Sequence, residues 1–191
     1  MSNTTYELIE KCLKFSISKD ETRVCLNGVY YDNSTLNAVS TDGYILTKSS
    51  LMYMPELSDL IVNYKDMTII RRDYLNWRPV IPNKFKHNIT VNFPKNDTVI
   101  KGRNQKEYGA FILNDGRLVI SSNTPENALV GLNPHFLKPL QGYTLEVGLN
   151  DPLNPIRVSL DGTDSNIYII MPIKMWMMDL WKNYSIDFYS A

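Results

Sequence analysis

Hydrophobic and polar positions near the start of the chain follow the period of a helix. Five apolar residues in the segment 5–16 fall on one stripe, and four charged residues lie off it. The apolar set is Leu8, Ile9, Cys12, Leu13 and Phe15, and the charged set is Glu7, Glu10, Lys11 and Lys14. This pattern predicts an amphipathic helix packed on a core. Its charged face either meets solvent or, at the two lysines, points at phosphate groups.

Most other apolar residues occur in short runs rich in β-branched and aromatic side chains and bounded by turn residues, which is typical of strands. The predicted strands are 23–31, 35–40, 44–47, 60–62, 67–70, 89–93, 98–100, 108–113, 118–121, 128–132, 144–149, 156–160 and 166–170. Asn-Asp-Gly at 114–116 lies between two apolar runs and predicts the clearest hairpin. Residues 71–77 are expected to form a short helix that ends before Pro79.

A second helix is predicted over residues 133–142. Asn133 fits an N-cap, Pro134 the first helical position and Gly142 the C-terminal stop. With its neighbours this helix gives the order strand, helix, strand, strand, strand, which the first third of the chain repeats in outline. We therefore expect an α+β fold built from such units, with antiparallel sheets and few short helices.

The composition is that of an ordinary globular protein, since 43% of the 191 residues are hydrophobic and 21% are charged. This length suffices for one domain or two small ones. The expected division is an N-terminal part, 1–82, and a C-terminal part, 83–191, which ends in an extension at 176–191. Twenty basic and twenty acidic residues balance to zero net charge. That balance excludes a polycationic or polyacidic protein but not a local basic face.

Residues with reactive side chains are sparse. Two cysteines and two histidines, without Cys-x-x-Cys or His-Glu-x-x-His spacing, argue against a metal site or a disulfide scaffold. No Gly-x-Ser-x-Gly elbow or phosphate-binding loop occurs, so we expect neither an enzyme nor a cofactor. The longest apolar run, 167–173, is too short for a membrane span. The first residues lack the pattern of a signal peptide, so we expect a cytoplasmic protein with free thiols.

Several segments carry a likeness to one protein family, in the family's order. Residues 13–31 contain Arg-Val-Cys-Leu-Asn-Gly after a predicted helix, and residues 38–46 read Ala-Val-Ser-Thr-Asp-Gly-Tyr-Ile-Leu. Residues 133–137 read Asn-Pro-His-Phe-Leu, and residues 168–175 read Tyr-Ile-Ile-Met-Pro-Ile-Lys-Met. A fainter match is Tyr-Leu-Asn-Trp-Arg-Pro-Val-Ile-Pro at 74–82. These segments resemble the bacterial replicative sliding clamp, the β subunit of DNA polymerase III.

The chain also departs from that family. It is too short for the family's three domains, and its centre is not matched. It continues for sixteen residues after Met175, near where family members end. Tyr44 and Ile45 stand where the family has His and Arg. A minimal clamp-like protein of a phage or mobile element would fit this pattern.

The resemblance implies a non-enzymatic ring that encircles duplex DNA, with basic residues of its helices facing the phosphates. The implied DNA-binding residues are Lys11, Lys14, Lys19, Arg23, His135 and Lys138. It also implies an apolar pocket in which a DNA polymerase or another partner docks a short peptide. The implied pocket residues are Thr41, Gly43, Tyr44, Ile45, Leu46, Pro79, Val80, Ile169, Met171 and Pro172. Without the resemblance, the same residues read as solvated charges and ordinary core.

Three functional hypotheses follow. The leading one is a clamp-like DNA replication accessory protein that forms a homo-oligomer, because so short a chain can close a ring only by self-association. The second is a clamp-fold protein that does not encircle DNA and instead regulates or mimics a replication clamp. The third is an unrelated small enzyme or structural protein. The aromatic extension at 176–191 either packs on the core as a terminal helix or contacts the peptide pocket of its own or a neighbouring chain.

Overall fold

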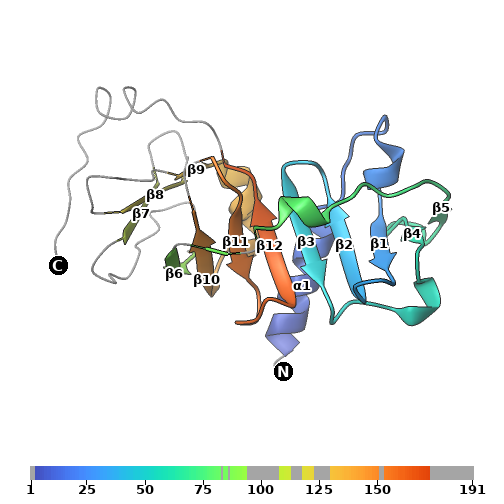
Figure 1. The fold of residues 1–191 in the computed structure, drawn as a ribbon, viewed down its shortest axis with the longest axis horizontal. Coiled ribbons are helices and arrows are strands. Elements are labelled where there is room, and N and C mark those ends of the chain that lie inside the picture. Colours follow the sequence, from blue (N-terminus) through green and yellow to red (C-terminus); the bar gives the residue numbers. More distant parts are fainter. Residues whose placement is uncertain are drawn as a thin grey trace.

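The structure is a computed structural model that describes residues 3–82, 84–85, 87–93, 108–112, 118–122, 130–150 and 153–172. Three sequence predictions lie outside these residues: the strand at 98–100, the turn at 114–116 and the extension at 176–191. The described part of the chain consists of two antiparallel sheets with helices packed against the larger one (Figure 1).

The larger sheet has nine strands in the order β5-β4-β1-β2-β3-β12-β11-β10-β6, and each neighbouring pair is antiparallel. Its strands are β1 (Val29–Asp32), β2 (Asn37–Thr41), β3 (Ile45–Ser49), β4 (Ile61–Val62), β5 (Ile69–Ile70), β6 (His87–Asn92), β10 (Thr144–Leu149), β11 (Ile156–Ser159) and β12 (Asn166–Ile170). The smaller sheet contains β7 (Tyr108–Ile112), β8 (Leu118–Ser122) and β9 (Val130–Leu132) in that order.

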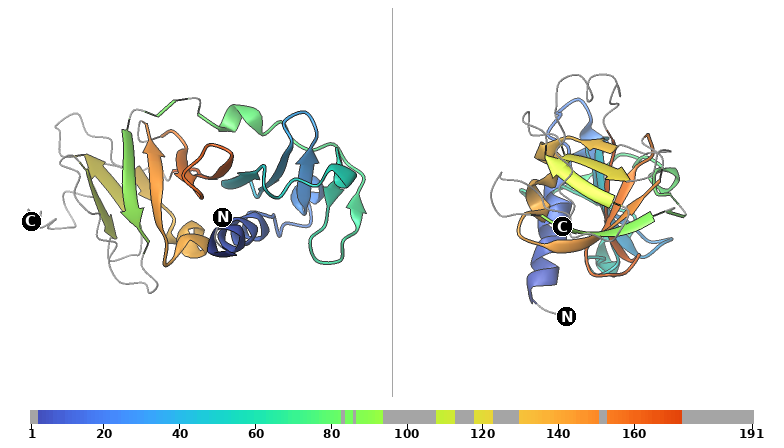
Figure 2. Two further views of the ribbon diagram at one scale, coloured as in Figure 1. Left: turned by 90° about the horizontal axis from the view of Figure 1, so that it is seen from below. Right: turned by 90° about the vertical axis from the view of Figure 1, so that its left-hand side faces the viewer.

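Two helices from distant parts of the chain lie side by side on one face of the larger sheet (Figure 2, left). The first, α1 (Asn3–Phe15), buries the apolar stripe that its periodicity predicts, except for Phe15, which is half-buried. The second, η4 (Pro134–Leu140), lies where a helix was predicted but is a 3₁₀ helix. Asn133 caps it by accepting a hydrogen bond from the His135 amide at 2.9 Å. Pro139 within it lacks the amide hydrogen that a regular α-helix would use.

Two local predictions were wrong. The start of the segment 23–31 is not strand, because the Arg23 amide donates to the Asp20 carbonyl at 3.0 Å and a 3₁₀ turn follows before β1. Residues 71–77 are not helical, and the helical turn of this region begins only at the next residue, with a proline in its first turn where a missing amide hydrogen is tolerated. The three short 3₁₀ turns are η1 (Val24–Leu26), η2 (Pro55–Leu57) and η3 (Arg78–Val80).

The predicted repetition of a helix followed by three strands is confirmed, and the two units meet in the middle of the larger sheet. The helix α1 precedes β1, β2 and β3, and η4 precedes β10, β11 and β12. The last strands of the two units, β3 and β12, pair antiparallel with Thr47 opposite Tyr168. One continuous sheet therefore joins residues from both ends of the chain, while the division at residue 82 stays a prediction.

The main apolar core lies between the two helices and the sheet. It contains the buried side of α1, and Tyr168 of β12 is fully buried in it. Two hydrogen bonds tie the end of α1 to β2 and β3. The Ser16 and Thr47 hydroxyl oxygens are 2.7 Å apart, and the Ser40 hydroxyl donates to the Leu13 carbonyl at 2.8 Å. These contacts fix the C-terminal end of α1 over β2 and β3.

The segment 71–82, which we call the strap, crosses the opposite face of the sheet on its way from β5 towards β6 (Figure 1). Neighbouring residues of a strand point to opposite faces, so Ile45 joins the helix-side core while Leu46 faces the strap. Trp77 of the strap is 5% exposed. It belongs to a second apolar cluster whose buried strand residues are Val39, Leu46, Ile167 and Ile169.

Two more aromatic rings, Tyr74 and Phe85, pack on this face of the larger sheet. Tyr74 stacks on Tyr30 of β1 with ring centroids 4.8 Å apart. Beyond the strap, Phe85 lies over Gly148 of β10, where an added Cβ would be 2.7 Å from the ring. The Arg157 guanidinium lies 4.4 Å from the centre of the same Phe85 ring. The sheet is thus covered on one face by helices and on the other by rings of one connecting segment.

Candidate functional site

The six implied DNA-binding residues are all exposed and occupy three elements. Lys11 and Lys14 lie on α1, His135 and Lys138 lie on η4, and Lys19 and Arg23 lie between α1 and η1. Because α1 and η4 are neighbours, the first four residues belong to two adjacent helices on the same side of the larger sheet. Within the described residues, no ion pair is found for Lys11, Lys19 or Lys138.

The charge on α1 is balanced rather than basic. The Lys14 ammonium lies 2.8 Å from the Glu10 carboxylate and 4.8 Å from the centre of the Tyr64 ring. The Tyr64 hydroxyl donates to the same carboxylate at 2.9 Å. The hydrogen bonds from Lys14 and Tyr64 hold the pKa of Glu10 below its ordinary value, so this group is ionised at neutral pH. With Glu7 also exposed, the two lysines of α1 face two carboxylates on the same helix.

Arg23 lies against a turn of the sheet and not on a helix, unlike Lys11, Lys14 and Lys138. Its Nη1 donates to the Asp42 carbonyl at 3.1 Å, and its Nε lies 3.3 Å from the Asp20 carboxylate. A Cβ added to Gly43 would lie 3.1 Å from the same Nη1. The structure therefore places Arg23 against the turn at 41–43, which the resemblance assigns to the peptide pocket.

Side chains of the chain itself build the turn at the end of β2. The Asp42 carboxylate accepts hydrogen bonds from the amides of Tyr44 at 2.8 Å and Ile45 at 2.9 Å. The Gly43 amide donates to the Thr41 hydroxyl at 3.0 Å. Gly43 has a φ of +95°, in the left-handed region that residues with a side chain disfavour. These contacts support a structural role for Asp42 and Gly43.

Replacing Gly43 with valine is expected to lower the free energy of unfolding by about 1–3 kcal/mol, because a β-branched residue is strained at that φ. Thermal denaturation measures the loss. Gly162→Val is a matched control, since its φ is +79° but an added Cβ would have no neighbour within 4 Å. A larger loss for Gly43 would report the contact with Arg23. An unchanged melting temperature for Gly43→Val would contradict the structural role.

Four rings beside this turn form a surface cluster, which we call the aromatic patch: Phe15, Tyr44, His135 and Phe136. The centroid distances are 5.3 Å from Phe15 to His135, 6.0 Å from His135 to Phe136 and 6.1 Å from Phe136 to Tyr44. Tyr44 is 58% exposed, His135 is exposed, and the two phenylalanines are half-buried. Phe15 and Phe136 were not among the implied site residues, because helical periodicity assigns both to the core.

The ten implied pocket residues differ sharply in accessibility. Four are buried: Thr41, Ile45, Leu46 and Ile169. Of these, Ile45 faces the helix-side core, and Leu46 and Ile169 share the apolar cluster with Trp77 of the strap. The accessible residues are Gly43, Tyr44, Pro79, Val80, Met171 and Pro172. The Met171 amide donates to the Tyr44 carbonyl at 2.8 Å, so the end of β12 lies beside the aromatic patch.

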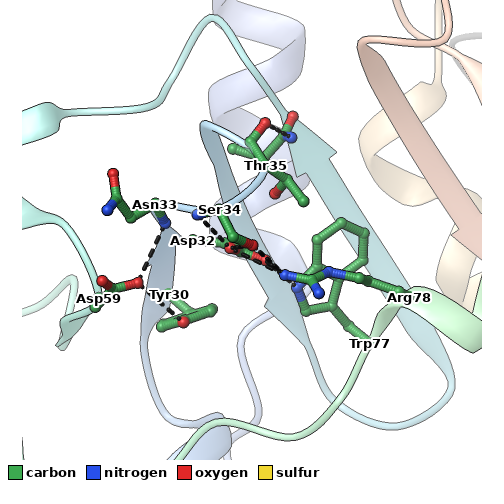
Figure 3. Close-up of polar contacts among 9 residues, drawn as sticks. Tyr30, Asp32, Asn33, Ser34, Thr35, Asp59, Trp77 and Arg78 are labelled. Carbon is green, nitrogen blue, oxygen red and sulfur yellow. Dashed lines mark hydrogen bonds and ion pairs between the residues drawn. The ribbon is translucent and has the colours of Figure 1, made fainter.

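A buried carboxylate fastens the strap to β1 (Figure 3). The Asp32 side chain is 3% exposed and accepts hydrogen bonds from Trp77 Nε1 at 3.1 Å and from the Arg78 guanidinium at 3.0 Å. The Ser34 amide and hydroxyl donate to the same carboxylate at 3.0 Å and 2.7 Å. Figure 3 shows both strap side chains reaching Asp32 from the same side. Asp32 thereby positions Pro79 and Val80, which follow Arg78 in the strap. The resemblance assigns these two residues to the pocket.

Stability is expected to depend on the ionisation of Asp32. Burial raises the pKa of this carboxyl, but hydrogen bonds from Ser34 and Arg78 and the charge of Arg78 outweigh it and hold the pKa below its ordinary value. The ionised Asp32 carboxylate therefore gives its full stabilisation above its pKa in the unfolded chain, about 4. This stabilisation is lost as the pH falls through its pKa in the folded protein. Asp32→Asn should reduce stability at neutral pH and flatten its loss in acid, measured by urea denaturation. If the free energy of unfolding of both proteins fell equally as the pH is lowered, this prediction would be contradicted.

Metal-ligating and thiol side chains are scattered over the described residues. In this part of the chain, no group of three or more His, Cys, Asp or Glu side chains could hold a metal ion. Cys12 and Cys25 are free thiols, and burial raises the pKa of the Cys12 thiol so that it stays protonated. No helix among the described residues is both long enough and apolar enough to cross a bilayer.

A cavity of about 330 Å³ lies apart from all the implied site residues, between the start of α1, β10 and the turn before β12. Its lining includes Leu8, Tyr143 and Glu146. Asp161 also lines it, but its carboxylate already accepts hydrogen bonds from Thr163 and Asn166. The lining offers hydroxyl groups and carboxylates without an arrangement that points to one reaction.

No family model matches the chain, and no curated protein matches it. Several solved structures, however, match the chain. The β sliding clamp of C. crescentus is 17% identical, with a TM-score of 0.60 over 92% of this chain and 64% of the clamp chain. The sliding clamp of Bartonella birtlesii, solved with bound griselimycin, is 16% identical, with a TM-score of 0.61 over 90% of this chain and 65% of that one. The DNA polymerase III β subunit of Thermotoga maritima is 17% identical, with a TM-score of 0.54 over 92% and 65%.

The chain thus spans a little under two thirds of the length of these clamps. At such low identity the likeness concerns the arrangement of the elements and not individual side chains. It extends over about nine tenths of this chain, so it includes most of the described helices and strands. The chain therefore has a sliding-clamp-like fold, similar in structure to the β subunits of bacterial DNA polymerase III.

Proposed function

We propose that the protein is a clamp-like accessory factor of DNA replication, without enzymatic activity. It holds duplex DNA by self-association and recruits partners at the surface beside the aromatic patch. The observation that carries this proposal is the fold, a pair of helices backed by one continuous antiparallel sheet, which solved clamps share. Because the chain is shorter than a clamp chain, a closed ring requires several copies. A phage or mobile-element origin fits this small size.

The modest charge of the helical face is compatible with such a role. A ring that encircles DNA is retained by its topology and needs no tight contact with the bases. Attraction between exposed lysines and phosphates is non-specific and screened by salt, which permits sliding. Lys11 and Lys138 are the best placed for this, since Lys14 is paired with Glu10.

The same charge balance favours a second candidate function. Glu7 and Glu10 offset the two lysines of α1, so this helix attracts a polyanion weakly. A clamp-fold protein that regulates or mimics a replication clamp would need no basic helical face. In that function the aromatic patch would bind replication proteins while the helices stay free of DNA.

The solution mass of the protein, measured with and without nicked circular DNA, separates the two candidates. Ring formation predicts a self-associated species that stays with circular DNA at moderate salt and is lost when the same DNA is linearised. A protein that remains monomeric at every concentration and does not co-migrate with circular DNA would overturn the ring. That outcome would favour the second function.

Changing Lys11 and Lys138 together to glutamate is expected to weaken retention on circular DNA about ten-fold at low salt, because two phosphate contacts are lost. The difference should shrink as salt is added. Lys65→Glu is the control, since Lys65 is also exposed but lies in the turn between β4 and β5. Equal retention of all variants across the salt series would remove Lys11 and Lys138 from the DNA-facing set.

A further inference from the structure

We infer that the aromatic patch is covered by the C-terminal segment of the same chain, residues 176–191. This inference rests on the proposed function only in taking the patch as a docking surface. The segment lies outside the described residues, but the place where the chain leaves them is defined. The Met171 amide is bonded to the Tyr44 carbonyl at 2.8 Å, and Pro172 is the last described residue. The segment therefore starts a few residues from the patch.

The patch has the character of an interface. One exposed aromatic residue is ordinary on a protein surface, but contiguous apolar surface marks an interaction site. Here the rings of Tyr44, Phe136, His135 and Phe15 form an unbroken series of contacts, and Tyr44 is more than half exposed. The hydrogen bond from the Tyr168 hydroxyl to the Phe136 carbonyl, at 2.9 Å, fixes the backbone of this series to the core. The surface is thus preformed by the fold.

The composition of the segment matches this surface. More than half of its residues are apolar or aromatic, which makes full exposure to water unfavourable. They are Trp176, Met177, Met178, Leu180, Trp181, Tyr184, Ile186, Phe188 and Tyr189. Its charged residues are Asp179, Lys182 and Asp187, with a net charge of −1.

The border of the patch carries charges of both signs, because the carboxylates of Asp20 and Asp42 lie beside Arg23 and Tyr44. Arg23 lies against the turn that precedes Tyr44. Lys138 follows His135 by three residues in a 3₁₀ helix, where such residues lie on the same side. The edges of the aromatic surface therefore offer both cations and carboxylates, and the segment likewise carries both signs of charge.

Tethering decides in favour of the same chain over other occupants. The nineteen residues after Pro172 span about 24 Å as a random coil, and their origin lies at the patch. Such a tether gives a local concentration of roughly a millimolar. A contact that is too weak to hold a separate copy or partner can therefore still form when the segment belongs to the same chain. A docking partner would have to displace the segment, which makes partner binding competitive.

Photo-cross-linking of the full chain tests this inference. Tyr44 is replaced by benzoylphenylalanine, the protein is irradiated at low concentration, and the linked peptides are identified by mass spectrometry. We expect cross-links from position 44 to residues 176–191 in the product of monomer size. The same probe at Ile69, which is 52% exposed on the distant edge strand β5, should give none of these links. Ile186→Ser with Phe188→Ser should lower the yield at position 44 several-fold.

Each remaining outcome overturns the inference. Cross-links within one chain would contain no mixed pairs when equal amounts of isotopically light and heavy chains are combined. If about half of the cross-links joined a light to a heavy chain, a second copy would be the occupant. Links from position 44 only to residues outside 176–191, or a yield unchanged by the two serine substitutions, would show that the segment does not cover the patch. The experiment contains no DNA and no partner, so a protein that fails to hold DNA can still confirm the inference.

Discussion

Replacing Trp77 with alanine is expected to lower the free energy of unfolding by about 3–5 kcal/mol, the range for truncating a buried large aromatic residue. Trp77 is 5% exposed and packs with residues of β2, β3 and β12 on the strap side of the sheet. Its indole also donates a hydrogen bond to Asp32, so the truncation removes one of the donors to a buried carboxylate. Because single domains are stable by about 5–15 kcal/mol, this is a large share of the total.

Urea denaturation followed by circular dichroism measures the effect. Trp77→Phe is the matched control, since it keeps a ring on the cluster but removes the donor to Asp32, and it should lie between the wild type and Trp77→Ala. A loss below about 1 kcal/mol for alanine, no more than an average substitution, would mean that the strap is not a stabilising layer.

Replacing Gly28 with alanine is expected to disrupt the pairing of β1 with β4. The added Cβ would lie 2.5 Å from the Val62 carbonyl oxygen and 2.8 Å from its carbonyl carbon. These are backbone atoms of the paired strand, so no rotation of a side chain can relieve the overlap. Either β4 and β5 move away from β1 or the sheet deforms, and we expect a loss of about 3 kcal/mol or more.

Gly148→Ala separates a clash with backbone from a clash with a side chain. Its added Cβ would lie 2.7 Å from Phe85, a ring that can turn away, so its loss of stability should be smaller. Hydrogen exchange gives a local readout, because only Gly28→Ala should speed exchange of the amides in β4 and β5. Equal losses for both variants, with β4 still protected, would show that the sheet accommodates the methyl group at Gly28.

The elements that the sequence predicts well are those whose signal is local. The helix α1 and the strands of the two repeated units follow from apolar periodicity within a few residues, and the structure has them close to the predicted positions. The strap was not predictable in the same way, because Trp77 packs on strands that precede it and on β12, which follows it by some ninety residues. The aromatic patch likewise combines α1, η4 and the turn before β3.

Two parts of the site prediction could have been sharper from local signals. Ile45 and Leu46 are adjacent in a strand, and alternation places them on opposite faces, so they cannot both line one pocket. Glu10 and Lys14 are four residues apart on a helix, the spacing of an ion pair, which argues against an unpaired lysine. What no local signal gives is the anchoring of Arg78 on Asp32, 46 residues apart in sequence.

The pairing of β3 with β12 has a consequence for synthesis on the ribosome. Ser49 and Asn166, which are hydrogen-bonded across this pair, are separated by 117 residues. At elongation rates of about 5–20 residues per second, β3 emerges on the order of ten seconds before its partner strand exists. During that interval it is an open sheet edge carrying Leu46, an apolar side chain that is buried in the finished fold. The nascent chain is therefore most prone to mispairing while its second half is still being made, and completion of β12 ends that exposure.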